Sequence, residues 1–445
     1  MIISHVYPPS LLAKPWVLHP DYKDKPIKSW STYPIDQQYS DYCLLNNVIF
    51  YDVGYDYNLL KLRLDTFFDK ELLQKIKNKE AILAIDQTVE SFYYIVELIY
   101  KHLVIEQGIP AEQILLICHS YDMANKIKEL AKELNQPELK CEYYNFWERQ
   151  HKLTILRTMN DLGLHNFDRI DENRKSGLYG FTTKRYVNLN NTWREHRFAL
   201  LCLLEGKNLI DKGYNSFSAS PHKVGFSVPN QSTSPYIRYQ SRPKLEQKEK
   251  EELDSKFKEW HTSVLNLFPK IKENLLQGYK VKDRLPLLLD TSDLALTLTW
   301  ANQTYLLKYF KNTYFSIVTE TCYMPEFPND APTAFLYNGN TAPNFITEKV
   351  FKPIGHKHPF IFVGMPNSLE VLKSWGYKTF DGLIDESYDK ETDNSERLLK
   401  IVNETERLCK LTGEDLINFK TQCQSIVEHN FHLFMKRENY IKRLI

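Results

Sequence analysis

The stretch from Phe335 to Asp389 decides the fold that we expect, and it reads FLYNGNTAPNFITEKVFKPIGHKHPFIFVGMPNSLEVLKSWGYKTFDGLIDESYD. An irregular run rich in Asn, Gly and Pro leads into a helix that we predict from Phe345 to about Ile354. A short apolar strand follows at 359–363, and a second helix is expected at 368–375. Strand, loop and helix alternate at the short spacing of an α/β layer.

The first turn of the predicted helix carries Thr347, Glu348 and Lys349. Free N–H groups at a helix start favour an anion by a few tenths to about 1 kcal/mol. A lysine there adds a charge-assisted hydrogen bond, worth about 1.5–3 kcal/mol. A neighbouring carboxylate is a good acceptor for sugar hydroxyls, as it is for ribose in dinucleotide sites. Together they suit a nucleoside diphosphate; the alternative is that Thr347 and Glu348 only cap a helix.

Composition sets the class of protein. The 445 residues suffice for two or three domains, and 42% hydrophobic and 25% charged residues are ordinary for a soluble globular protein. A formal net charge of +1 gives no reason to expect nucleic acid or an anionic membrane as a partner. The first residues lack the apolar core of a signal peptide, and no run approaches the roughly 18 apolar residues of a membrane span. We therefore expect a cytoplasmic protein without a transmembrane segment.

Cysteine usage agrees with that compartment. The seven cysteines are scattered, odd in number and never at CxxC spacing. This pattern favours free thiols and argues against a zinc site.

The N-terminal third repeats strand–helix units. Continuous apolar strands are expected at 48–53, 81–86, 113–119 and 139–146, and helices at about 57–77, 89–104 and 123–134. This alternation predicts a parallel sheet covered on both faces, in a Rossmann-like domain. No GxGxxG follows the first strand, so a dinucleotide cofactor is not expected there.

Three polar side chains stand where these strands end, namely Asp86, Glu90 and His119. Parallel sheets present such residues to a cleft, where a carboxylate or imidazole can act as a general base. The alternative is helix capping for Asp86 and Glu90, and a hydrogen-bonded loop histidine for His119.

A second alternation begins after a charged, glycine-containing break at about 170–180. A strand at 185–190 precedes a helix at 193–205, whose first turns carry Arg194, His196 and Arg197. Because a guanidinium binds two phosphate oxygens at once, this basic site suits a phosphate. The alternative is a solvated helix face.

The remaining pattern completes two domains. A loop is expected at 216–245, an amphipathic helix at 244–268, another at 300–311, and a strand at 314–318 that ends at Glu320. Glu320 should lie near the Glu348–Lys349 helix start. We predict an N-terminal domain at 1–176 and a C-terminal domain at 177–445, the latter with a helical insertion at 244–275 and a helical C-terminal tail.

The C-terminal half resembles the donor-binding domain of GT-B glycosyltransferases, most nearly the α-1,3-fucosyltransferase-like group. Three ordered motifs carry the resemblance: VNLN at 187–190 followed by Arg197, VTET at 318–321, and FITEK at 345–349. Residues beyond the last motif look more like uncharacterised glycosyltransferase-like proteins of phages, large viruses and some bacteria.

The resemblance implies a GT-B-like fold, with two Rossmann-like domains whose parallel sheets face a cleft. It also implies that Arg197 and Lys349 hold the donor diphosphate and that Glu348 binds the ribose hydroxyls. Asn190, Arg194, Glu320 and Thr347 complete the expected donor site, which needs no metal and no further cofactor. The lack of an Asp-x-Asp between apolar strands argues against the metal-dependent GT-A architecture.

We therefore expect a glycosyltransferase that moves a sugar from a GDP- or UDP-linked donor to a glycan, protein or small-molecule acceptor. The donor site would stabilise the leaving diphosphate, and the N-terminal domain would supply a base. A sugar-nucleotide epimerase or hydrolase, and a non-catalytic carbohydrate-binding protein, are the alternatives.

Overall fold

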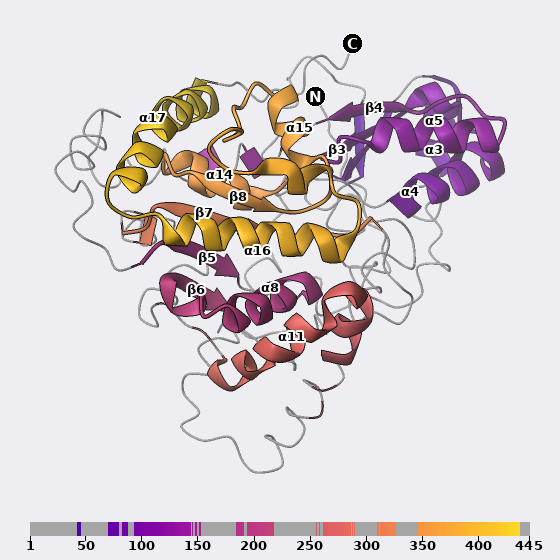
Figure 1. Cartoon of the computed structure of the whole chain (residues 1–445). Helices are drawn as coiled ribbons and strands as arrows, with labels where there is room; N and C mark the ends of the chain where they lie inside the picture. Colours follow the sequence, from indigo (N-terminus) through magenta and orange to yellow (C-terminus); the bar gives the residue numbers. More distant parts are fainter. Residues whose placement is uncertain are drawn as a thin grey trace, which may run out of the picture.

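The computed structural model describes residues 42–45, 70–79, 82–87, 93–143, 145, 147–148, 151–152, 184–190, 194–217, 255, 258, 261–285, 287, 289, 309–310, 312–325 and 346–436. Within these residues the chain is α/β, with two four-stranded sheets whose neighbouring strands are all parallel. Figure 1 shows the N-terminal part in indigo and purple beside a larger C-terminal part. The predicted fold class, α/β with parallel sheets, is thus confirmed.

The N-terminal sheet follows chain order without a reversal. Its strands are β1 (Tyr42–Leu45), β2 (Ile82–Gln87), β3 (Ile114–Cys118) and β4 (Lys140–Tyr143), in the spatial order β1-β2-β3-β4. Every residue of β3, ILLIC, is buried, as expected for a strand with helices around it. The helices are α3 (Lys70–Lys77), α4 (Tyr93–Leu98), the π-helix η4 (Ile99–Glu106), the short 3-10 helix η5 (Ala111–Gln113) and α5 (Met123–Glu133).

Two expectations for this part need comment. The predicted strand at 48–53 lies outside the described residues, whereas β1 was not predicted. The helix expected at 89–104 is α4 continued by η4, in which His102 is buried together with its apolar neighbours. An apolar pattern alone does not distinguish the two helix types.

The C-terminal sheet reverses its strand order. Its strands are β5 (Tyr186–Asn190), β6 (Gly213–Phe217), β7 (Phe315–Thr319) and β8 (Phe360–Val363), arranged as β6-β5-β7-β8. From β5 the chain passes through α8 (Glu195–Gly206) to β6 on one side, and it later returns to β7 on the other side. Helix α14 (Glu348–Gly355) then connects β7 to β8. The carboxyl ends of β5 and β7 therefore flank the point where ligands bind in open α/β sheets.

Strand β6 includes the first two residues, 216–217, of the loop expected at 216–245, and the rest of that loop lies outside the described residues. Its sequence, GYNSF, lacks the apolar run from which strands are predicted. The buried Asn215 side chain donates to the Ile210 carbonyl (2.9 Å) and to the Tyr186 hydroxyl (3.2 Å). At Gly213 any Cβ would lie 2.2 Å from the Tyr186 ring, so only glycine fits there. Polar pairing and close packing thus make this strand.

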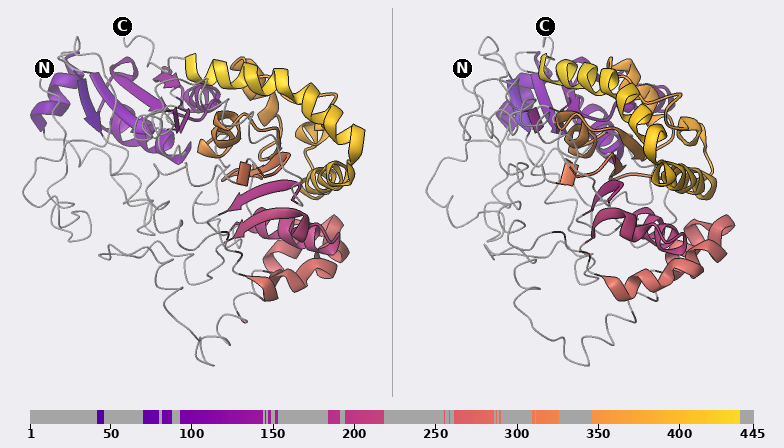
Figure 2. Two further views of the ribbon diagram at one scale, coloured as in Figure 1. Left: turned by 90° about the vertical axis from the view of Figure 1, so that its left-hand side faces the viewer. Right: turned by 60° about the vertical axis from the view of Figure 1, so that its left-hand side comes forward.

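Helices complete the C-terminal part. They include α11 (Lys272–Gly278), η8 (Pro269–Ile271), η9 (Tyr279–Arg284), η6 (Ile210–Lys212), α15 (Ser368–Ser374), η12 (Glu386–Lys390), α16 (Asn394–Lys410) and α17 (Gly413–Lys436). Figures 1 and 2 place α8 and α11 together, away from α17, which packs against α14. The described part of the predicted insertion, 261–275, is mostly helical, and so is the C-terminal tail to Lys436. No helix in the described ranges is long and apolar enough to cross a membrane.

The two parts contact each other through the end of β4 and through the connecting segment that follows it, of which residues 145, 147–148 and 151–152 are described. The Tyr377 hydroxyl donates to the buried Glu148 carboxylate (2.5 Å), and the Tyr143 and Trp375 rings stack with centroids 5.6 Å apart. The boundary expected at residue 176 lies outside the described residues and stays a prediction.

Candidate functional site

Glu320 is the centre of the candidate site. It directly follows β7 at the strand-order reversal, and only 1% of it is exposed. Its carboxylate accepts hydrogen bonds from the Thr347 N–H (3.0 Å), the Thr347 hydroxyl (2.6 Å) and the Thr321 N–H (3.2 Å). The end of β7 is therefore tied to the residue that precedes α14, so that the predicted proximity of Glu320 to this helix start is confirmed.

The Lys349 ammonium lies above this carboxylate. It is 2.9 Å from the Thr347 hydroxyl, 3.2 Å from the Thr321 hydroxyl, 3.2 Å from Glu348 Oε1 and 4.0 Å from Glu320 Oε2. Its side chain remains 20% exposed, so that a ligand can reach it. The Thr347 hydroxyl also accepts from the Lys349 N–H (3.5 Å). Thr347 thus caps the helix, as the alternative interpretation held, and it also positions the lysine.

Burial and neighbouring charges separate the two carboxylates. Burial raises the pKa of Glu320, although the Lys349 charge opposes the shift. Burial also opposes ionisation of Glu348, but the charges of Lys349 and Lys352 prevail and lower its pKa to about 2. Glu348 is therefore ionised throughout the neutral range and can accept hydrogen bonds from hydroxyls.

The start of α8 holds the backbone of the β7 end from the other side. Arg197, only 3% exposed, donates from one guanidinium nitrogen to the carbonyls of Thr319 (3.3 Å) and Glu320 (3.0 Å). His196 Nε2 lies 3.0 Å from the same Glu320 carbonyl, and it must donate because a carbonyl only accepts. Burial, reinforced by the charge of Arg197, lowers the pKa of His196 well below its usual range.

These positions correct two expectations for α8. His196 is neutral at neutral pH and adds no positive charge to the site. A solvated helix face is also wrong for Arg197 and His196, because both are buried. Arg194 stands at the N-cap of α8, where its carbonyl accepts from the N–H groups of Arg197 and Phe198 (both 3.1 Å). Its side chain is partly exposed.

Asn190 belongs to a buried polar ladder across three strands. Its amide donates to Asn188 Oδ1 (2.7 Å), and the Asn188 amide donates to Asn215 Oδ1 (3.3 Å) on β6. On the other side the side-chain oxygen of Asn190, Oδ1, accepts from the Thr319 hydroxyl on β7. The ladder fixes β5 against both neighbours immediately before Glu320, which gives Asn190 a structural role in addition to the predicted one.

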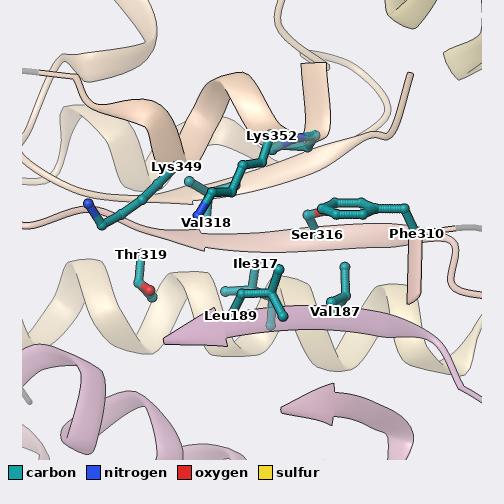
Figure 3. A pocket seen from close by; sticks show the side chains of 10 residues that line it. Val187, Leu189, Phe310, Ser316, Ile317, Val318, Thr319, Lys349 and Lys352 are labelled. Atoms are coloured by element: carbon teal, nitrogen blue, oxygen red, sulfur yellow. The ribbon is translucent and has the colours of Figure 1, made fainter. Parts of the chain in front are cut away.

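A hollow lies between β5, β7 and α14, as Figure 3 shows. It is small, with a cavity volume of about 20 Å³, enough for about one water molecule. Lys349 and Lys352 reach into it from α14, while Val187 and Leu189 of β5 face them. Sequence reasoning did not single out Lys352, although its spacing of three from Lys349 places both on one side of a helix.

The candidate bases of the N-terminal part are placed only in part. His119 follows β3 and is 1% exposed. Asp86 lies within β2, one residue before its end, and Glu90 is outside the described residues. His151, which was not predicted, approaches α14 from this part of the chain. Burial and the charge of Lys352 lower its pKa to about 3.

The described residues contain no group of three or more His, Cys, Asp or Glu side chains arranged to hold a metal ion. Among them, six cysteines are free, and Cys118 Sγ and Cys141 Sγ lie 3.8 Å apart on adjacent strands.

The sequence matches no model of a protein family and no curated protein. Among solved structures, the chain is similar to the N-terminal domain of trehalose-6-phosphate phosphatase from Candida albicans, at 8% sequence identity. The similarity covers 86% of this chain and 73% of that one, with a TM-score of 0.34. A score this low supports no inference about fold or function.

Proposed function

We propose that this chain is a nucleotide-sugar-dependent glycosyltransferase of GT-B type, which binds the diphosphate of its donor at the start of α14 without a metal ion. The observation that carries the proposal is the Lys349 ammonium. It is held by two threonine hydroxyls over the β7 end, at a strand-order reversal, and its side chain remains partly exposed. Open α/β sheets bind nucleotides at this place.

The chemistry follows from the charges. The leaving nucleoside diphosphate gains negative charge as the glycosidic bond breaks. Lys349 and the first N–H groups of α14 would stabilise that charge, because they are already oriented before the reaction. The ionised Glu348 beside them suits two ribose hydroxyls. The diphosphate would take over the contacts that the Thr347 and Thr321 hydroxyls now make to the ammonium.

For Arg197 we propose another role than the direct binding of the diphosphate that the resemblance implied. Its guanidinium holds the carbonyls of Thr319 and Glu320, and these contacts orient the residue that is tied to the start of α14. We therefore assign it as a positioning residue, which acts on the donor through Glu320 and Thr347.

The acceptor would bind from the N-terminal part, in the cleft that a GT-B arrangement provides. Asp86, Glu90 and His119 stay the proposed bases for an inverting reaction. The donor would be linked to GDP or UDP, and the acceptor would be a glycan, a protein or a small molecule.

Thermal unfolding against a panel of nucleoside diphosphates and sugar nucleotides tests the donor site. A ligand at about 100 times its dissociation constant should add about 2.7 kcal/mol of stability. We expect a shift with one nucleotide base that is insensitive to EDTA and absent in Lys349→Met. Lys357→Met is the matched control, since Lys357 pairs with Glu428 (2.8 Å) outside the site.

Product analysis then separates the enzyme classes. Incubation of the stabilising sugar nucleotide with candidate acceptors should transfer the sugar, as detected by mass spectrometry. Consumption of the donor without any acceptor would identify a hydrolase or epimerase instead. If no nucleotide shifts the unfolding temperature, the proposed function is wrong.

A further inference from the structure

We propose that Cys118 and Cys141 form a thiol pair that a peroxide oxidises to an intrachain disulfide and that a dithiol reduces again. The pair lies in the N-terminal sheet, outside the candidate donor site. The inference therefore does not rest on the proposed function.

The two sulfur atoms are already in contact. Cys118 Sγ and Cys141 Sγ lie 3.8 Å apart on the neighbouring parallel strands β3 and β4, which Figure 1 labels. In the register of these strands, Cys141 pairs with Leu116, and Cys118 pairs with Tyr143. Because side chains two residues apart share one face of a sheet, the two cysteines are diagonal neighbours on the same face. A disulfide requires their sulfur atoms to approach to about 2 Å.

Strand β4 can supply this movement because of its place in the sheet. Among the described strands, β3 is the only neighbour of β4. The residues of β4 are exposed or partly exposed, whereas those of β3 are all buried. A strand with one partner and few buried side chains is the less constrained of the two. Cys141 can therefore shift toward Cys118 while β3 keeps its position in the core.

The two thiols differ in exposure, and this difference assigns an order to the reaction. Cys141 is partly exposed, so that a small peroxide can reach its sulfur, whereas Cys118 is 0% exposed. The hydrogen-bonding contact with Cys141 and burial both raise the pKa of Cys118 well above its usual range, so that this thiol keeps its proton. Cys141 is therefore the thiol that meets the oxidant, and Cys118 is the thiol that closes the bond.

The reaction balances in two steps. In the first, the Cys141 thiolate attacks an oxygen of hydrogen peroxide, the O–O bond breaks, and a sulfenic acid and hydroxide form. In the second, the Cys118 sulfur attacks the sulfenic sulfur, the S–O bond breaks, and the hydroxyl group leaves as water with the Cys118 proton. The hydroxide takes up the proton that Cys141 released. Two thiols and one peroxide thus give one disulfide and two waters.

Peptide mapping of the folded full-length chain tests the site, with hydrogen peroxide as the oxidant. After the remaining thiols are blocked and the chain is digested without reductant, mass spectrometry should find the Cys118 and Cys141 peptides joined, two hydrogens lighter than their sum. Dithiothreitol should separate them. We expect this bridge to be the main disulfide of the folded chain. The preference should disappear when the seven cysteines are oxidised in guanidinium chloride that unfolds the chain.

Single substitutions test the order of the two steps. In Cys118→Ala the sulfenic acid on Cys141 lacks its partner, so that dimedone, which reacts with sulfenic acids, should label Cys141 more strongly than in wild type. In Cys141→Ser the buried Cys118 should remain a thiol under the same exposure to peroxide. The matched control is Cys409→Ala, which removes a buried cysteine of α16 and should leave the bridge intact.

Three results would overturn the inference: both residues recovered as thiols after peroxide treatment of wild type, other cysteine pairs bridged to the same extent, or a bridge that forms only in the unfolded chain. The two cysteines would then serve only as small packing residues of the N-terminal core. The wild-type mapping needs no variant, so that a Cys118→Ala chain that failed to fold would leave this test in place. Dimedone labelling of Cys118 in Cys141→Ser would contradict the assigned order.

Discussion

The two sheets share a parallel architecture and differ in strand order. The N-terminal sheet runs β1-β2-β3-β4 with no reversal among its described strands, whereas the C-terminal sheet runs β6-β5-β7-β8 and reverses between β5 and β7. At the reversal, successive connections leave the sheet in opposite directions and open a crevice beyond the strand ends. Lys349 and Glu320 lie there, and the hollow extends from Thr319 back beneath α14. Strand order thus indicates which of two similar sheets carries the candidate site.

The two sheets also differ in the polarity of their buried strands. Strand β3 is wholly apolar and buried, whereas β5 places Asn188 and Asn190 in the interior and satisfies them through a ladder of side chains. A buried polar network is stabilising only if each member has a partner, and it then fixes a single geometry. The C-terminal sheet uses such a network where positions must be accurate, immediately before Glu320.

The largest effect should come from Lys349→Met. Loss of a preoriented charge at the developing diphosphate charge should reduce kcat/KM by about 10²–10³-fold, with little change in unfolding temperature. Steady-state kinetics with the donor measures it. Leu116→Ala, in the buried centre of β3, is the opposite case: it should cost about 2–5 kcal/mol of stability without changing nucleotide binding by the folded protein. Equal catalytic losses in both variants would remove the distinction between the sheets.

Two buried carboxyl groups of the C-terminal part should make its stability depend on pH. Burial raises the pKa of Glu386 to about 7, against 4.5 for an ordinary glutamate, and raises that of Asp389 to about 6. The folded state therefore binds these protons more strongly than the unfolded state does. The stabilising contribution of Glu386 is complete below about pH 4.5 and is lost as the pH rises through about 7, and that of Asp389 is complete below about pH 3.8 and is lost through about 6.

Glu386→Gln isolates this contribution. Glutamine keeps an acceptor for the Phe380 N–H, which now lies 2.6 Å from Glu386 Oε1. The variant should match wild type at pH 4 and exceed its free energy of unfolding by about 2–4 kcal/mol at pH 8. Denaturant unfolding at both pH values measures the difference. A constant difference across this range would show that Glu386 does not titrate as described.

A smaller effect should follow from breaking the asparagine ladder. Asn188→Leu leaves Asn190 and Asn215 without one buried partner each, at a cost of about 1–3 kcal/mol. Because the ladder ends at Thr319, donor binding should weaken as well. The matched change in the other sheet, Ile117→Leu in β3, should cost less than about 1.5 kcal/mol and leave donor binding unchanged. Chemical unfolding and nucleotide titration together separate the two outcomes.

The sequence predicts the apolar strands better than the polar ones. Apolar runs located β2, β3, β7 and β8 to within about two residues, because burial dictates their composition, and β5 was located equally well from a pattern that includes two asparagines. The pattern missed β6, whose polar residues are satisfied only by partners distant in sequence, such as Tyr186. Pairing between distant segments leaves no local signal.

The candidate site shows the same limit. Glu320 and the Glu348–Lys349 start could be placed together because both followed from strand and helix ends. The direction of the Arg197 side chain could not, since whether a guanidinium faces solvent or a carbonyl depends on the packing of α8 against β7. Lys352 was overlooked for a related reason: its place in the hollow between α14 and the sheet is a property of the folded protein.

The smallest effect on stability should come from His151, the residue of the connecting segment that approaches α14. It is 1% exposed, its ring lies 5.9 Å from that of Phe434, and neither of its nitrogens has a hydrogen-bond partner within the described part of the chain. A buried imidazole without partners contributes packing at the expense of desolvating its polar atoms, so His151→Phe should change the free energy of unfolding by less than about 1 kcal/mol. If His151 only packs, turnover should also be unchanged, and the base must come from elsewhere in the N-terminal part. A loss of turnover of tenfold or more with unchanged stability would instead show that His151 takes part in the reaction. The chemistry would then not be confined to the C-terminal sheet.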